Sequence, residues 1–271
     1  MNTLDKMKLL FFGDIVARPG RQAVRQTLPK WQKEYLPDVV IGCVDNLAHG
    51  KGATAKTIAE LKELGFSAFT TGDHVLNSPA GLELVADESL PIVRPLNAPS
   101  GTPGVGARRI SVGKNDLLLV HLMGQVFMPG DYSSPFKAVD EILQDENSIT
   151  GVSGIVVDVH AEATSEKVAL GWYLDGRVTA VLGTHTHITT ADEWIMPKGT
   201  AYITDVGMTG VKESVLGVKT EIIIDRFVHE GKERFEPAES GTVIVNALLV
   251  TFDNKQATSI ERLRESVTIS A

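Results

Sequence analysis

The chain has 271 residues and a formal net charge of −8, because 34 aspartates and glutamates outnumber 26 lysines and arginines. This acidic balance argues against binding a long nucleic acid by counterion release, which needs a basic face, but a small phosphorylated substrate remains acceptable. The single cysteine, Cys43, excludes an intrachain disulfide. Because Cys43 lies in an apolar run, we expect a buried, unreactive thiol rather than a metal ligand.

The organisation of the chain predicts one domain over residues 1–271. Apolar runs alternate with helical patterns from residue 8 to about residue 182, without a linker or a shift of composition. Residues 1–8 lack the pattern of a secretory leader, and no apolar run approaches the roughly 20 residues that a membrane span needs. We therefore expect a cytoplasmic protein, and a homo-oligomer because closed homo-oligomers are common.

Five apolar, strand-like runs are each followed by residues that can bind a metal or a phosphate. They are 8–12 with Asp14, 39–44 with Asp45 and Asn46, 68–71 with Asp73 and His74, 155–159 with His160, and 178–182 with His185 and His187. In an extended chain, side chains two residues apart project to the same side, so His185 and His187 can both reach neighbouring metal ions. Because parallel strands bring their carboxyl ends to one edge of a sheet, we expect all these residues to meet there.

Helical patterns fall between these runs, as a layered α/β protein requires. Residues 54–64 carry apolar side chains at helical spacing, and Gly65 is the expected stop. Residues 21–35 form a second candidate, which Pro29 should kink or split.

Residues 94–106 are rich in proline and glycine and cannot form a regular helix, so we predict a long structured loop. Such a loop either carries function or is a simple surface connection.

The rest of the chain is predicted to hold two more helices and then strands. The expected segments are helices over 136–143 and 166–174 and antiparallel strands over 221–227 and 242–250. Thr164 and Ser165 are residues of the capping type before the second of these helices. The strands would add a second sheet or extend the first one.

The polar residues at the strand ends predict a dinuclear metal centre. Carboxylate oxygens together with imidazole nitrogens suit Fe, Mn or Zn better than Mg or Ca. Six protein ligands exceed what one open catalytic ion needs, whereas two ions bridged by a carboxylate and a hydroxide would use all six. The candidate ligands are Asp14, Asp45, Asp73, His160, His185 and His187.

His74 and Asn46 are the candidate residues that act without binding metal. A histidine beside the centre can protonate a leaving alkoxide, because imidazole titrates near neutral pH. The amide of Asn46 can donate to a phosphoryl oxygen. Taken singly, each motif could be an ordinary turn, a helix cap or a satisfied histidine, but five at successive strand ends favour a shared site. The other histidines are expected to be structural or surface residues; they are His49, His121 and His229.

Three motifs resemble those of the calcineurin-like metallophosphoesterases: Gly13-Asp14, Gly72-Asp73-His74, and Gly-x-His-x-His at 183–187. More closely, the chain resembles the bacterial YmdB-like family of cyclic-nucleotide phosphodiesterases over nearly its whole length. The blocks that carry this resemblance are 13–21, 94–97, 103–106, 158–167 and 199–210.

The resemblance implies an α/β fold of four layers, an α/β/β/α sandwich of two mixed sheets. It also implies iron or manganese in the centre, with zinc as another candidate, and 2′,3′- or 3′,5′-cyclic nucleotides as substrates attacked by a metal-bound hydroxide. The implied roles are Asp14 and His187 on the first metal, His160, His185 and Asp73 on the second, Asp45 between the two, Asn46 in the site, and His74 as general acid.

Three positions depart from the family's pattern. Asp45 stands where glutamate is usual, so bridging two metals requires a backbone shift or a changed metal spacing. Asp73 stands where asparagine is usual and makes the centre less positive by one charge. A less positive centre should polarise phosphate less and hold a ferric ion better. His49 lies where small residues are usual, and we expect it to be exposed rather than to touch substrate.

Two alternative functions remain open at this point. The first is a phosphomonoesterase or nucleotidase on the same centre, and the loop from Asn97 to Gly106 would separate it from a diesterase. The second is a metal-binding regulatory protein with little catalysis. The acidic balance argues against direct nucleic-acid binding by such a protein, and the retention of the other ligands argues against a dead site.

Overall fold

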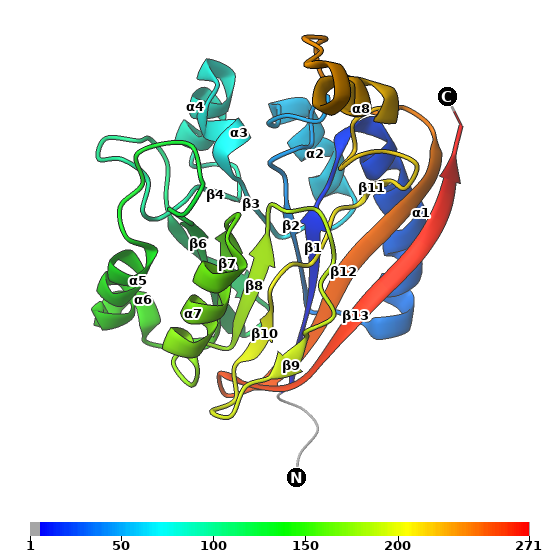
Figure 1. The fold of residues 1–271 in the computed structure, drawn as a ribbon. Helices are drawn as coiled ribbons and strands as arrows, with labels where there is room; N and C mark the ends of the chain where they lie inside the picture. Colours follow the sequence, from blue (N-terminus) through cyan, green and yellow to red (C-terminus); the bar gives the residue numbers. More distant parts are fainter. Residues whose placement is uncertain (1–5, 271) are drawn as a thin grey trace.

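The computed structural model describes residues 6–270, which form two β-sheets packed face to face (Figure 1). The first sheet has the order β11-β12-β1-β2-β3-β4, with β13 beside β12, and the second has the order β5-β6-β7-β8-β10-β9. The strands of the first sheet are β1 (Met7–Asp14), β2 (Val39–Cys43), β3 (Ala68–Thr70), β4 (Ile92–Val93), β11 (Gly210–Val211), β12 (Gly241–Asp253) and β13 (Gln256–Ile269). Those of the second are β5 (Ala107–Val112), β6 (Asn115–Met123), β7 (Val152–His160), β8 (Ala180–Thr184), β9 (Trp194–Ile195) and β10 (Ala201–Ile203).

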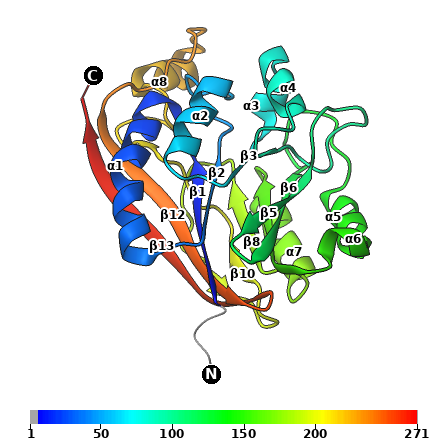
Figure 2. The ribbon, with the colours of Figure 1, turned by 180° about the vertical axis from the view of Figure 1, so that it is seen from behind.

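Helices cover the outer faces of both sheets, with α1 on one flank and α5 and α7 on the other (Figure 1; Figure 2 shows the opposite side). The helices are α1 (Ala17–Tyr35), α2 (Ala55–Glu63), α3 (Asp73–Leu76), α4 (Pro79–Ala86), α5 (Pro135–Gln144), α6 (Glu146–Ile149), α7 (Thr164–Leu174) and α8 (Thr220–His229). Within the described range, no helix combines the length and the apolar character that crossing a membrane requires.

The alternation of side chains along β1 shows why four layers form. Leu9 and Phe11 pack in the core between the sheets, together with residues of β6, β7 and β8. Leu10 and Phe12 point the other way, into a core that includes residues of α1 and α2. Every one of these side chains is buried, because successive residues of a strand face opposite sides. The expected α/β/β/α sandwich of two mixed sheets is confirmed.

The strand predicted over 221–227 is wrong, because this segment lies in α8. Three consecutive isoleucines favour a strand locally, but Ile222 alone of the three is buried. Asp225 and His229, four residues apart, contact each other at 3.0 Å on the helix surface. Contacts between residues at helical spacing therefore outweigh the strand propensity of the three isoleucines. The strand predicted over 242–250 is confirmed as part of β12, which pairs antiparallel with β1 and extends the first sheet.

The helix candidates are confirmed with two corrections. The helix expected over 54–64 is α2, and the one expected over 136–143 is α5. α1 is not split at Pro29, since one helix continues to Tyr35 and buries Leu28 and Trp31 on either side of the proline. Thr164 and Ser165 do not cap α7, because both lie inside its first turn and Ala163 is the residue before it.

The segment 94–106 contains neither helix nor strand, as predicted. The Arg94 side chain holds this loop together by donating to the carbonyl oxygens of Pro95 at 2.7 Å and Pro103 at 3.2 Å. Part of the N-terminal segment that was expected to lack a leader, residues 1–5, lies outside the described residues.

Candidate metal centre

The candidate ligands lie between the two sheets, at the carboxyl ends of five strands. β1, β2 and β3 run parallel in the first sheet, and β7 and β8 run parallel in the second. The expectation that one sheet edge collects all the ligands is therefore wrong. Two edges contribute, and they meet because the sheets pack face to face.

His160, at the end of β7, lies at the centre of the cluster. Its Nε2 is 3.7 Å from Asp45 Oδ2, 3.7 Å from Asp73 Oδ1 and 3.1 Å from His185 Nδ1. Its Nδ1 is 3.9 Å from Asp14 Oδ1. Because His160 is only 1% exposed, these contacts form in a nearly dry environment. Five of the six candidate ligands are therefore brought together around one imidazole.

His187, the sixth candidate ligand, lies at the Asp14 side of the cluster. Its Nε2 is 4.0 Å from Asp14 Oδ1 and 3.2 Å from the Asn46 side-chain oxygen. Its Nδ1 is 3.0 Å from the Leu216 carbonyl oxygen. The contact with the Leu216 carbonyl oxygen fixes the orientation of the His187 ring and leaves its Nε2 facing the cluster.

The turn that carries the two histidines is not extended, contrary to the prediction. His185 has φ 95° and His187 has φ 67°, values in the left-handed region that non-glycine residues rarely adopt. His185 faces His160 and Asp73, whereas His187 faces Asp14. The strained backbone thus directs two neighbouring side chains to different parts of the cluster.

A buried ion pair supports this strained turn. Lys167 of α7 donates to Asp205 Oδ2 at 2.8 Å and to the Thr184 carbonyl oxygen at 2.6 Å. The same Asp205 oxygen accepts from the Thr186 backbone N–H at 3.1 Å and from its hydroxyl at 2.8 Å. Lys167 and Asp205 are at most 1% exposed. The turn is therefore tied on both sides of His185.

Three observations show that the residues present fit metal ions. The Oδ1 atom of Asp73 is buried and has no hydrogen-bond partner among the described residues. A Cβ added at Gly72 would lie 2.5 Å from His160 Nε2 and 2.6 Å from Asp45 Cγ, so glycine keeps this space open. Mixed carboxylate and imidazole donors are those of a transition-metal site. A cation would give the orphaned carboxylate oxygen a partner.

Three overlapping groups of side chains offer ligand atoms within 4.8 Å of one another. These groups are Asp73–His160–His185, Asp45–Asp73–His74 and Asp14–Cys43–His160. They share members, so neighbouring ions could be held by the same cluster. Cys43 is buried as expected, but its Sγ lies 3.3 Å from Asp14 Oδ1, nearer to the centre than its apolar run indicated.

The carboxylates of the cluster respond differently to their surroundings. Burial raises the pKa of Asp14, but the charges of His187 and His160 outweigh this effect and lower the pKa to about 2. Burial likewise raises the pKa of Asp73, but the contact with His160 at 3.7 Å and the charges of the neighbouring histidines lower it to about 2. For Asp45, burial prevails and the pKa is raised. Deprotonated acids in this site thus depend on a nearby positive charge.

The pKa values of the two central imidazoles are shifted in opposite directions. Burial lowers the pKa of His160, but contact with Asp73 and the charge of Asp14 raise it to about 9. Burial and the positive charge of His160 lower the pKa of His185 to about 3. The three buried carboxylates around His160 thus favour positive charge at this place, which bound cations would supply.

His74 and Asp45 are positioned by the short helix α3. The backbone N–H groups of His74 and Val75 donate to the two oxygens of Asp45, at 3.2 and 3.0 Å. His74 Nδ1 lies 3.3 Å from Asp73 Oδ2, and its side chain is 33% exposed. Asp73 thus faces the cluster with one oxygen and His74 with the other, which leaves His74 Nε2 free of that contact.

A buried network behind His160 is missing from the sequence analysis. The Thr184 hydroxyl lies 2.9 Å from His160 Nδ1 and donates to Asp158 Oδ1 at 2.8 Å. His121 Nδ1 lies 3.3 Å from Asp158 Oδ2, and both side chains are fully buried. The sequence signal that could have revealed this network was a polar residue inside each of two apolar strands. Asp158 lies two positions before His160 and therefore on the same face of its strand. His121 is structural, as expected.

Another contact that the sequence analysis did not identify involves Glu162, whose Oε2 lies 3.3 Å from His185 Nε2. His49 and His229 are exposed, in agreement with the expectation.

Comparison with known proteins gives consistent matches over most of the chain. The family model for YmdB-like proteins matches residues 10–263. A 2′,3′-cyclic-nucleotide 2′-phosphodiesterase of Bacillus subtilis is 43% identical over 258 residues, covering 95% of this chain and 96% of the relative. A hypothetical protein of Thermus thermophilus has a solved structure with TM-score 0.89 and 41% identity, covering 96% of this chain and 99% of its own. A novel phosphatase of Mycoplasma pneumoniae also has TM-score 0.89, with 33% identity and coverage of 97% and 94%.

Proposed function

The chain belongs to the YmdB-like family, and from this premise we propose that it is a dinuclear metal phosphodiesterase. Its proposed substrates are 2′,3′-cyclic nucleotides and, as a further class, 3′,5′-cyclic nucleotides. The observation that carries the proposal is the gathering of three buried carboxylates and His185 around His160, with Asp73 Oδ1 buried and without a hydrogen-bond partner among residues 6–270. The activity named for the Bacillus subtilis relative supports the choice of substrate.

Two transition-metal ions fit the cluster, with iron first and manganese or zinc as alternatives. Asp14 and His187 would hold one ion, and His160, His185 and Asp73 the other, with Asp45 between them. When bound, such ions supply Lewis acidity that polarises the phosphoryl group and acidifies water.

The chain's own residues orient the substrate and move a proton. His74 would donate a proton from Nε2 to the leaving ribose oxygen, because Nδ1 faces Asp73 Oδ2 at 3.3 Å. One N–H of the Asn46 amide donates to the Gly50 carbonyl oxygen at 3.0 Å, so its other N–H is the one left for a phosphoryl oxygen.

Replacing His74 with alanine is expected to lower the turnover of 2′,3′-cyclic AMP by roughly 10²- to 10⁴-fold while the metal content is retained. Initial rates and elemental analysis of the same samples would check this. His229→Ala is the matched control, since that side chain is 72% exposed on α8. Equal activity in the two variants would remove His74 from the mechanism, and loss of metal would make it a ligand.

A phosphomonoesterase is the second candidate, and the word phosphatase in the description of the Mycoplasma pneumoniae structure favours it. The loop over 94–106 would separate the two activities. Asn97 anchors this loop against β6 by donating to the Met123 carbonyl oxygen at 2.7 Å and accepting from its N–H at 2.9 Å. Rates on cyclic nucleotides, linear diesters and monoesters would distinguish the candidates.

A further inference from the structure

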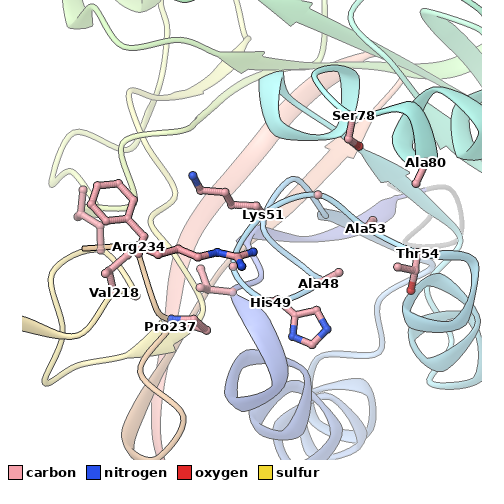
Figure 3. A pocket seen from close by; sticks show the side chains of 16 residues that line it. Ala48, His49, Lys51, Ala53, Thr54, Ser78, Ala80, Val218, Arg234 and Pro237 are labelled. Carbon is pink, nitrogen blue, oxygen red and sulfur yellow. The ribbon is translucent and has the colours of Figure 1, made fainter. Parts of the chain in front are cut away.

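A cavity of about 410 Å³ lies between the loop after β2 and the segment after α8 (Figure 3). Residues 48–54 form one wall, and residues 216–218 form the opposite wall together with Arg234, Phe235 and Pro237. Three further lining residues are Val16, which precedes α1, and Ser78 and Ala80 at the start of α4. The cavity is open to solvent on a surface where a ligand can enter.

The cavity borders the segments that carry the metal centre, although no candidate ligand is among its lining residues. Gly50 and Gly52 line it, and they contact the side chain of Asn46 at 3.0 Å and the carbonyl oxygen of Asp45 at 2.5 Å, respectively. Leu216 lines it as well, and its carbonyl oxygen is 3.0 Å from His187 Nδ1. Both walls of the cavity therefore contact residues that lie at the centre.

Two cationic side chains enter the cavity without an acidic partner. Figure 3 shows Lys51 and Arg234 extending into it from the two walls. Among residues 6–270, no carboxylate forms an ion pair with either of them, and no aspartate or glutamate lines the cavity. Glu236, which feels the charge of Arg234, pairs with Lys219 at 2.6 Å. Unpaired cations stand out in a chain whose net charge is −8.

The amino ends of two helices add positive potential to the same cavity. Thr54 precedes the first residue of α2 and Ser78 precedes that of α4, and both line the cavity. The Thr54 hydroxyl accepts from the Thr57 N–H, the Ser78 hydroxyl accepts from the Gly81 N–H, and Pro79 has no N–H. The two ends therefore offer only their remaining first-turn N–H groups and the positive end of the helix dipole to an anion. The cavity thus combines two helix ends with two unpaired cations, which is the chemistry that recognises phosphate.

We propose that this cavity binds a second phosphate of the substrate, on the other side of the nucleoside from the phosphodiester that is cleaved. The inference rests on the proposed function. It makes the preferred substrate either a 2′,3′-cyclic nucleotide with a 5′-phosphate or a short oligonucleotide that ends in a 2′,3′-cyclic phosphate. The acidic surface disfavours long RNA.

The kinetic test compares kcat/KM for 2′,3′-cyclic AMP, its 5′-phosphorylated form and a dinucleotide ending in 2′,3′-cyclic phosphate. A second phosphate is expected to raise kcat/KM about tenfold, mainly through KM, because charge-assisted contacts to it are new. If only the 5′-phosphorylated nucleotide shows the higher kcat/KM, the ligand of the cavity is a terminal phosphate. If only the dinucleotide shows it, the ligand is an internucleotide phosphate.

The variants Lys51→Ala and Arg234→Ala are each expected to reduce this advantage about three- to tenfold, whereas Lys51→Arg should keep most of it. Lys33→Ala is the matched control, because it removes an exposed charge from the last turn of α1 without touching the cavity. The proposal is overturned if the second phosphate gives no advantage, or if the advantage survives the double alanine variant.

A binding measurement separates this proposal from the proposed function. In chelator-treated protein the three carboxylates of the centre repel phosphate, so calorimetry with adenosine 5′-monophosphate, against adenosine, reports on the cavity. Binding that needs Lys51 and Arg234 supports the second-phosphate site even if no phosphoester is hydrolysed. Hydrolysis of cyclic AMP with no preference for adenosine 5′-monophosphate over adenosine supports the proposed function and rejects the site.

Discussion

Replacing His160 with alanine is expected to lower kcat/KM for 2′,3′-cyclic AMP by at least about 10³-fold and to remove metal from the protein. His160 Nε2 lies within 3.7 Å of Asp45, Asp73 and His185, and its Nδ1 is 3.9 Å from Asp14. No other side chain of the cluster contacts so many candidate ligands. Its removal takes away a ligand atom that lies beside three buried carboxylates, so the cluster should hold metal less tightly.

Elemental analysis and initial rates on the same preparation would measure both effects. Circular dichroism shows whether the variant is folded, and His185→Ala provides a second test if His160→Ala is not. His229→Ala should keep the wild-type metal content and rate, because His229 is exposed on α8 and contacts Asp225 rather than the cluster. A His160→Ala protein with full metal content and normal turnover would contradict the proposed centre.

Replacing Lys167 with methionine is expected to lower the free energy of unfolding by about 3–5 kcal/mol. Lys167 is 1% exposed and pairs with Asp205 at 2.8 Å, so its loss leaves a buried carboxylate without a counter-charge. The same change releases the Thr184 carbonyl oxygen, one residue before the strained His185. We therefore expect weaker metal binding as well as lower stability, both of which thermal unfolding with and without added metal would detect.

Lys30→Met is the matched control for this second prediction. Lys30 pairs with Glu265 at a similar distance, 2.7 Å, but its side chain is 63% exposed, so its loss should cost less than about 1 kcal/mol. The double variant Lys167→Met, Asp205→Leu should recover part of the lost stability, because it removes both buried charges. Equal effects of Lys167→Met and Lys30→Met would mean that burial does not set the strength of this pair.

The positions of the candidate ligands could be predicted from the sequence because each lies at or soon after the end of a strand, with His185 and His187 sharing β8. The carboxyl end of a buried strand is a local pattern, and Asp14, Asp45, Asp73 and His160 all occupy such ends. Parallel pairing then brings neighbouring ends together. The layers could be predicted only through the resemblance, since periodicity alone did not show which strands share a sheet.

Features that depend on distant pairs could not be predicted in the same way. Lys167 and Asp205 are 38 residues apart, and nothing in either local sequence names the other as its partner. The left-handed backbone of His185 and His187 lies in the turn that this pair contacts at Thr184 and Thr186, whereas a run of alternating residues favours an extended chain. The strand predicted over 221–227 was wrong for a related reason. Three consecutive isoleucines do not show that only one side of this segment is buried.

The most direct test of the central claim is elemental analysis of the purified protein, combined with an assay of the same sample for hydrolysis of 2′,3′-cyclic AMP. The dinuclear phosphodiesterase predicts close to two transition-metal ions per chain together with turnover, both lost after treatment with a chelator and restored by added metal. One ion or none in an active protein, or turnover that survives complete removal of metal, would contradict it.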